Sequence, residues 1–138
     1  MELRKLTAEL AVAGQLTPGD IAAVAATGVK GIVCNRPDGE GGPDQATFSA
    51  IEKAAAEHGI AIVYQPVTPA AISDNDAATF GRIVDELPKP ALAYCRTGTR
   101  CTVLWGLSQA GKLPARTILD TAAAAGYDLR PYLPRLAK

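Results

Sequence analysis

The chain has 138 residues, 48% of them hydrophobic, and its basic and acidic residues balance to a formal net charge of zero. This length fits one domain over residues 1–138, and the balanced charge argues against a nucleic-acid-binding surface or a polybasic membrane binder. No apolar run is long enough to cross a membrane, the N-terminus lacks a signal-peptide core, and three cysteines are too few for a disulfide scaffold. We therefore expect a cytoplasmic, single-domain protein with no membrane or nucleic-acid partner.

The first part of the chain alternates short apolar runs with amphipathic stretches. Residues 9–13 predict a strand, and the capping threonine and proline of Thr17-Pro18-Gly19-Asp20 predict a helix that ends at Gly28. Residues 29–34 are apolar and β-branched, which predicts a second strand. The glycines and prolines of residues 36–44 predict a loop.

The alternation continues through the rest of the chain. The elements expected there are a helix at about 47–58, strands at 60–64 and 90–94, a loop at 66–71, a capped helix at 73–87, a helical run from 103 to 111, a helix at 113–126 and a short irregular helix in the tail at 129–136. Strands that alternate with helices predict an α/β fold with a mainly parallel sheet flanked by helices. Ligands in such folds bind outside the carboxyl ends of the strands, which places the loops after residues 34, 64 and 94 on one rim.

The stretch Tyr94–Thr102 is the strongest functional signal. Cys95 follows an apolar strand, and a small-residue loop then leads into a helix. Loop amides and a helix N-terminus can hold an anion, and Arg96 and Arg100 add positive charge. The same field is expected to lower the pKa of Cys95 and favour the nucleophilic thiolate.

Four motifs together resemble a known family. They are Val12-Ala13-Gly14-Gln15-Leu16-Thr17, Asn35-Arg36-Pro37-Asp38-Gly39-Glu40, Pro66-Val67 and Tyr94-Cys95-Arg96-Thr97-Gly98-Thr99-Arg100. They resemble, over roughly residues 5–125, the phosphatase-like domain of β-lactamase hydrolase-like proteins, also called domain of unknown function 442. The resemblance implies a cysteine-phosphatase-like fold of the dual-specificity type. Members are described as phosphatases or as sulfurtransferases, often beside sulfide-oxidation enzymes, which are possible partners by the same resemblance.

The spacing of the loop favours sulfur transfer. Four residues separate Cys95 from Arg100, as in rhodanese-type loops, whereas cysteine phosphatases have five and usually a histidine at the position of Tyr94. We expect Cys95 to take sulfur from thiosulfate or a small persulfide and to pass it to a thiol or cyanide, with Arg100 neutralising the leaving anion and no cofactor required. The substrate-binding residues expected beside them are Arg96, Thr97, Gly98, Thr99, Arg36 and Asp38.

Two other functions remain open. A phosphatase would need an acid for the leaving group, and Asp38, Asp74 and Asp76 are the candidates, although each also suits a turn or a helix cap. A sensor would carry a persulfide or an anion without turnover. Arg36 has a structural interpretation too, as a brace paired with Asp38 or Glu40.

The remaining cysteines and the single histidine are secondary candidates. Cys101 stands where related loops carry serine or threonine, and we interpret it as a core residue or a resolving thiol. Cys34 ends a strand on the same rim, so a Cys34–Cys95 disulfide is conceivable. His58 is expected at a helix end, and one histidine gives no histidine-rich metal site.

Overall fold

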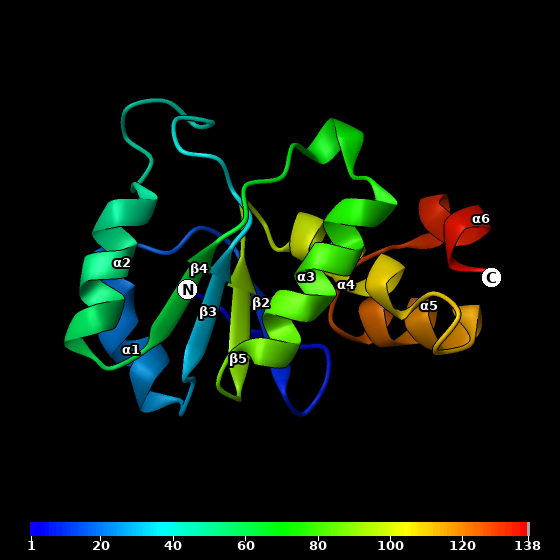
Figure 1. The fold of residues 1–138 in the computed structure, drawn as a ribbon, viewed down its shortest axis with the longest axis horizontal. Helices are drawn as coiled ribbons and strands as arrows, with labels where there is room; N and C mark the ends of the chain where they lie inside the picture. The colour runs from blue at the N-terminus through cyan, green and yellow to red at the C-terminus, as the bar shows by residue number, and fades with distance from the viewer. Residues whose placement is uncertain (138) are drawn as a thin grey trace.

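A five-stranded sheet with the order β1-β2-β5-β3-β4 runs through the centre of the protein in the computed structural model, which describes residues 1–137 (Figure 1). The strands are β1 (Arg4–Lys5), β2 (Leu10–Ala13), β3 (Gly31–Cys34), β4 (Ala61–Tyr64) and β5 (Ala91–Tyr94). The last four pair in parallel, and β1 runs antiparallel to β2. The mainly parallel α/β sheet is therefore confirmed, whereas β1 was not predicted, because two exposed basic residues carry no strand pattern.

Helices cover both faces of the sheet (Figure 1). On one face lie α1 (Ile21–Ala26) and α2 (Phe48–Glu57), and on the other α3 (Asp74–Glu86), α4 (Thr99–Gln109), α5 (Ala115–Ala124) and α6 (Leu133–Leu136). Successive residues of β5 alternate between the two cores, with Leu92 and Tyr94 in the first and Ala91 and Ala93 in the second. Three short 3₁₀ helices occupy Pro18–Asp20, Pro69–Ala71 and Arg130–Tyr132.

Several predicted helix ends coincide with observed caps. The Thr47 hydroxyl accepts from the Ala50 amide at 3.2 Å at the start of α2, and His58 is the C-cap residue that follows the helix. Ser73 and Asp76 form the predicted capping box of α3. The start of α4 differs from the prediction, because the helix begins at Thr99, four residues before the apolar run that indicated it.

The loops after β3, β4 and β5 meet at the carboxyl edge of the sheet. In Figure 1 the first two of these loops rise above the strands, at the top of the view. The amide of Gln65 donates to the carbonyl of Cys34 at 2.8 Å, and that of Asn35 donates to Tyr94 at 2.9 Å, so the three strand ends are tied together. The rim expected from the sequence is thus formed. Among residues 1–137, no helix is long and apolar enough to cross a membrane.

Candidate active site

Cys95 lies directly after β5, at the base of the loop that leads into α4. Its backbone N–H donates to the carbonyl of Ala13 at 3.3 Å, so the residue extends the sheet by one position. Only 1% of Cys95 is exposed, and its Sγ accepts a hydrogen bond from the Gly98 amide at 3.1 Å. Gly98 has a φ of 89°, a conformation that suits glycine and lets the chain turn into α4. The expected strand–loop–helix arrangement is therefore present around Cys95.

Hydrogen bonds lower the pKa of the Cys95 thiol from 9.0 to about 5. The largest contribution comes from the side chain of Cys101, and the backbone N–H groups of Cys101, Thr97 and Gly98 add to it against the opposing effect of burial. Each of these donors favours the ionised sulfur over the neutral thiol. Cys95 is consequently a thiolate at neutral pH, which is the nucleophilic form of the side chain.

The cause of this shift differs from the expectation that arginine charges produce it. Hydrogen bonds dominate, and no arginine is among the leading causes of the lowered Cys95 pKa. The Arg100 guanidinium is paired with the Glu40 carboxylate at 2.9 Å, which offsets its charge. Arg96 is exposed, so solvent screens it.

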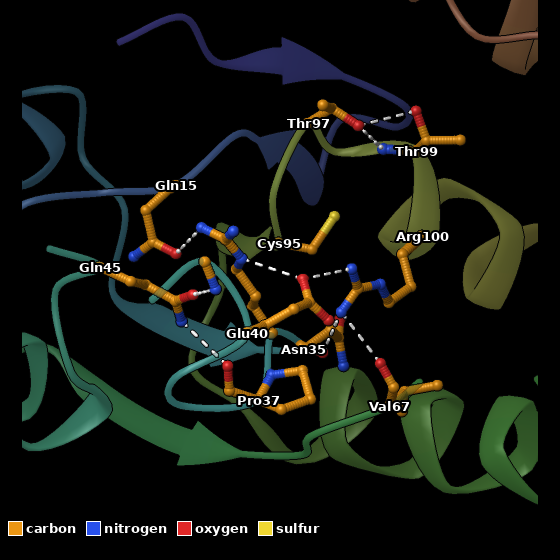
Figure 2. A network of polar contacts seen from close by, with 12 residues as sticks. Gln15, Asn35, Pro37, Glu40, Gln45, Val67, Cys95, Thr97, Thr99 and Arg100 are labelled. Carbon is orange, nitrogen blue, oxygen red and sulfur yellow. Dashed lines mark hydrogen bonds and ion pairs between the residues drawn. The ribbon is translucent and has the colours of Figure 1, made fainter. Parts of the chain in front are cut away.

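Arg100 is buried and held from three sides. Its Nη1 donates to the carbonyls of Asn35 at 3.3 Å and Val67 at 3.0 Å, while Nη2 donates to Glu40 (Figure 2). Only 6% of the residue is exposed. The buried Nε has no hydrogen-bond partner among the described residues. Arg100 can therefore present this N–H to a bound anion while the rest of its guanidinium stays fixed.

Arg36 braces the site instead of entering it. Its Nε donates to Glu40 at 3.0 Å, and its Nη1 donates to the Gln15 side chain at 3.2 Å. Glu40 thus links Arg36 to Arg100, and the hydrogen bond from Arg100 is the largest of the effects that lower the Glu40 pKa. The bracing interpretation of Arg36 agrees with this geometry, with Glu40 and not Asp38 as the partner.

A cavity of about 220 Å³ opens above Cys95. The loop and the start of α4 supply one part of its lining, namely Cys95, Arg96, Thr97, Thr99, Arg100 and Val103. Pro69, Ile72 and Tyr132 form the rest. The structure therefore brings together five of the predicted site residues, whereas Gly98, Arg36 and Asp38 lie outside the lining. Tyr132 was not predicted, because nothing in the tail sequence indicates that it returns to this rim.

The three candidate acids lie outside the lining of the cavity. A carboxylate oxygen of Asp38 accepts from the first amide of α2 at 2.8 Å, and one of Asp76 accepts from the Ser73 amide at 3.0 Å. Asp74 forms an ion pair with Arg135 at 2.9 Å. Each carboxylate therefore has a structural contact. The capping role of Asp76 agrees with the prediction, whereas the partners of Asp38 and Asp74 lie farther along the chain than a turn or a helix cap requires. Within residues 1–137, no group of three or more His, Cys, Asp or Glu side chains is placed to hold a metal ion.

The other two cysteines have different surroundings. Cys101 is buried, and its thiol forms a hydrogen bond with the Cys95 sulfur, so this position supplies a donor although it carries no hydroxyl. Thr102 does not supply it, because its hydroxyl donates to the Gly98 carbonyl at 2.8 Å. Cys34 belongs to the core on the opposite face of the sheet from Cys95 and donates to the Arg36 carbonyl at 3.4 Å. All three thiols are free, so the conceivable Cys34–Cys95 disulfide is absent.

We expect the alkylation rate of Cys95 by iodoacetamide to rise with pH around a midpoint near 5 and to level off above it. Because Cys101 is the main cause of the low pKa, Cys101→Ala is expected to move the midpoint upward. Cys101→Ser, which restores a donor, is expected to keep it low. The rate is measured on the Cys95 peptide by mass spectrometry, with Cys34→Ala as the control. A midpoint that stays the same in Cys101→Ala would contradict the assigned cause.

Comparisons with known proteins agree with this geometry. The family model described as "Beta-lactamase hydrolase-like protein, phosphatase-like domain" matches residues 2–112. The chain is 31% identical over 131 residues to the β-lactamase hydrolase-like protein of Agrobacterium fabrum, covering 94% of this chain and 30% of that relative. It thus spans about a third of the length of this curated relative.

Solved structures share the fold. A proposed phosphatase of Neisseria meningitidis superposes with a TM-score of 0.86 at 39% identity, over 99% of this chain and 96% of the other. Kinase associated phosphatase, studied with a serine in place of its catalytic-site cysteine, superposes with a TM-score of 0.68 at 13% identity, over 95% and 89% of the two chains. At that identity the second likeness concerns the fold alone. Both support the expected cysteine-phosphatase-like architecture.

Proposed function

The chain belongs to the family of phosphatase-like domains of β-lactamase hydrolase-like proteins, and on this basis we propose that it is a cysteine-dependent phosphatase with Cys95 as the nucleophile. One observation carries the proposal. A cysteine with a pKa of about 5 lies at the base of a cavity lined by a loop, beside a buried arginine whose Nε–H has no partner among the described residues. The 39% identity to a proposed phosphatase supports the same choice over sulfur transfer, which the comparisons do not support.

The proposed reaction has two steps. The Cys95 thiolate attacks phosphorus, so that a sulfur–phosphorus bond forms while the bond from phosphorus to the leaving oxygen breaks and that oxygen keeps the electron pair. Arg100 and the loop amides stabilise the charge on the other phosphoryl oxygens. Water then attacks the phosphoryl group on Cys95, which releases phosphate and restores the thiolate, and the proton from water passes to solvent.

The leaving group of such a substrate meets no strong proton donor in the cavity lining. The residues that line the cavity include no carboxylate and no histidine, and Tyr132 supplies the one phenol among them. The remaining proton donors are this phenol and water, both weak acids, so substrates whose leaving group is a weak base react best. Aryl phosphates and phosphoanhydrides satisfy this requirement better than alkyl phosphates.

Sulfur transfer is the second candidate, because the four-residue spacing from Cys95 to Arg100 and the lack of a carboxylate or histidine in the cavity lining both suit it. In that reaction the thiolate attacks the outer sulfur of thiosulfate. A new sulfur–sulfur bond forms on Cys95, and sulfite leaves with the electron pair of the broken bond. A thiol or cyanide then removes the sulfur. Sulfite is a weakly basic leaving group that needs no proton donor.

One experiment separates the candidates. The protein is incubated either with p-nitrophenyl phosphate or with thiosulfate and cyanide, and the products and the intact mass of the protein are measured. The proposal predicts release of phosphate and p-nitrophenol that depends on Cys95. Thiocyanate production, with a mass increase of one sulfur atom and no phosphate release, would replace the phosphatase by the sulfurtransferase. A stable sulfur adduct without any turnover would indicate a sensor.

A further inference from the structure

Two carbonyl groups of the Cys95 loop are held on the side that faces away from the sulfur. The Arg96 carbonyl accepts from the Gln15 amide at 3.3 Å, and the Thr97 carbonyl accepts from the Tyr127 hydroxyl at 3.0 Å. The carbonyl and the N–H of a trans peptide point in opposite directions. The N–H groups paired with these carbonyls, those of Thr97 and Gly98, are the loop amides that bond to the Cys95 sulfur.

Tyr127 is fixed in this place by contacts on both sides. Its own amide donates to the Ala122 carbonyl at 2.9 Å at the end of α5. The Arg4 guanidinium lies 5.9 Å from the centre of the Tyr127 ring and donates to the Ala125 carbonyl at 2.9 Å. On the other side, the Tyr127 hydroxyl lies so close to Gly98 that a Cβ on Gly98 would overlap it. Burial raises the Tyr127 pKa, so the hydroxyl keeps the proton that it donates.

We propose that Tyr127 is a positioning residue: by holding the Thr97 carbonyl, it keeps the Gly98 amide directed at the Cys95 sulfur and at the group transferred to it. Tyr127 follows α5 and lies beyond residues 2–112, which match the family model. The segment that follows α5 therefore contributes to the active site and does not only pack against the sheet. The effect on catalysis rests on the proposed function, whereas the effect on the thiolate holds for any reaction of Cys95.

The test compares Tyr127→Phe with Tyr64→Phe. Each variant removes one hydroxyl that bonds to the backbone, but the Tyr64 hydroxyl, at the edge of the sheet, bonds to the Asp38 amide at 2.9 Å and not to the Cys95 loop. Tyr127→Phe is expected to raise the midpoint of the pH profile of Cys95 alkylation by about half a unit and to lower kcat/KM for p-nitrophenyl phosphate about three- to tenfold. Tyr64→Phe is expected to change neither quantity.

The two readouts distinguish the failure of this inference from that of the proposed function. An unchanged alkylation midpoint in folded Tyr127→Phe would overturn the positioning role, even if the melting temperature falls. A raised midpoint in a protein that hydrolyses no aryl phosphate would support the positioning role and reject the phosphatase. Arg4→Ala, which removes the guanidinium beside the Tyr127 ring, provides a second variant with a smaller shift expected in the same direction.

Discussion

Replacement of Cys95 by serine is expected to reduce the hydrolysis of p-nitrophenyl phosphate by at least about 1,000-fold. Cys95 is a thiolate at neutral pH because four hydrogen bonds favour its ionised sulfur, whereas a serine hydroxyl at the same place stays protonated and is a poor nucleophile. The replacement is close in size, so the fold is retained. Phosphate release is measured at pH 7, with circular dichroism to confirm folding.

Cys34→Ser is the matched control for this experiment. It introduces the same change at another buried cysteine at the end of a neighbouring strand, and the serine hydroxyl can still donate to the Arg36 carbonyl. Its activity is expected to remain within about twofold of that of the unmodified protein. If Cys95→Ser and Cys34→Ser were equally active, the nucleophile would have to be another group.

Much of the fold could be predicted because its signals are local. The capping box of Ser73 and Asp76 and the apolar runs of β3 and β5 each lie within a few neighbouring residues. The first turn of α4 was not predicted as helix, because Thr99 to Thr102 are polar or small and the apolar run begins only at Val103. The strand β1 forms by pairing with β2, and its two exposed residues show no pattern that would predict this pairing.

The candidate site could be predicted only in part, because some of its contacts are local and others join residues far apart in the chain. Cys95 and Arg100 lie in one short loop, so their proximity follows from sequence. The Glu40 carboxylate reaches Arg100 across 60 positions of the chain, and the Tyr127 hydroxyl reaches Thr97 across 30. Such contacts depend on how the layers pack, and no pattern of residue types encodes them. The role of Cys101 was underestimated, because a thiol was not expected to replace a hydroxyl donor.

The spacing of the loop favours the transfer of sulfur, whereas the fold of the chain favours the transfer of a phosphoryl group. The spacing between Cys95 and Arg100 affects only the loop amides around the Cys95 sulfur. The fold and the 39% sequence identity concern the whole chain. The lowered pKa of Cys95 serves both reactions, because each begins with attack by the thiolate. What separates them is where the charged oxygen atoms lie. In phosphoryl transfer they belong to the group that becomes bonded to Cys95, whereas in sulfur transfer from thiosulfate they leave with sulfite. A phosphoryl group in transfer presents several charged oxygens, so a fixed guanidinium beside Cys95 matters more for the phosphatase.

Arg100→Lys is for this reason expected to lower kcat/KM for p-nitrophenyl phosphate by about 100-fold or more, even though the positive charge remains. A lysine ammonium is a single point of charge. It cannot bond to Asn35, Val67 and Glu40 and also offer the separate donor that Nε supplies. Loss of these bonds is also expected to lower the free energy of unfolding by about 1 to 3 kcal/mol, which urea titration measures.

Arg96→Lys is the comparison that makes the result specific. Arg96 lines the same cavity but is exposed, so its charge is screened by solvent and a lysine can replace it with a loss of less than about tenfold. A large loss in Arg100→Lys beside a small one in Arg96→Lys would assign the transition-state contact to the buried arginine. Equal losses would mean that net charge at the cavity decides the rate, and the fixed geometry of Arg100 would then have no special role. Alanine at position 100 is less informative, because it removes the charge, the Arg100 donor to the Val67 carbonyl and one of the two guanidinium partners of the Glu40 carboxylate all at once.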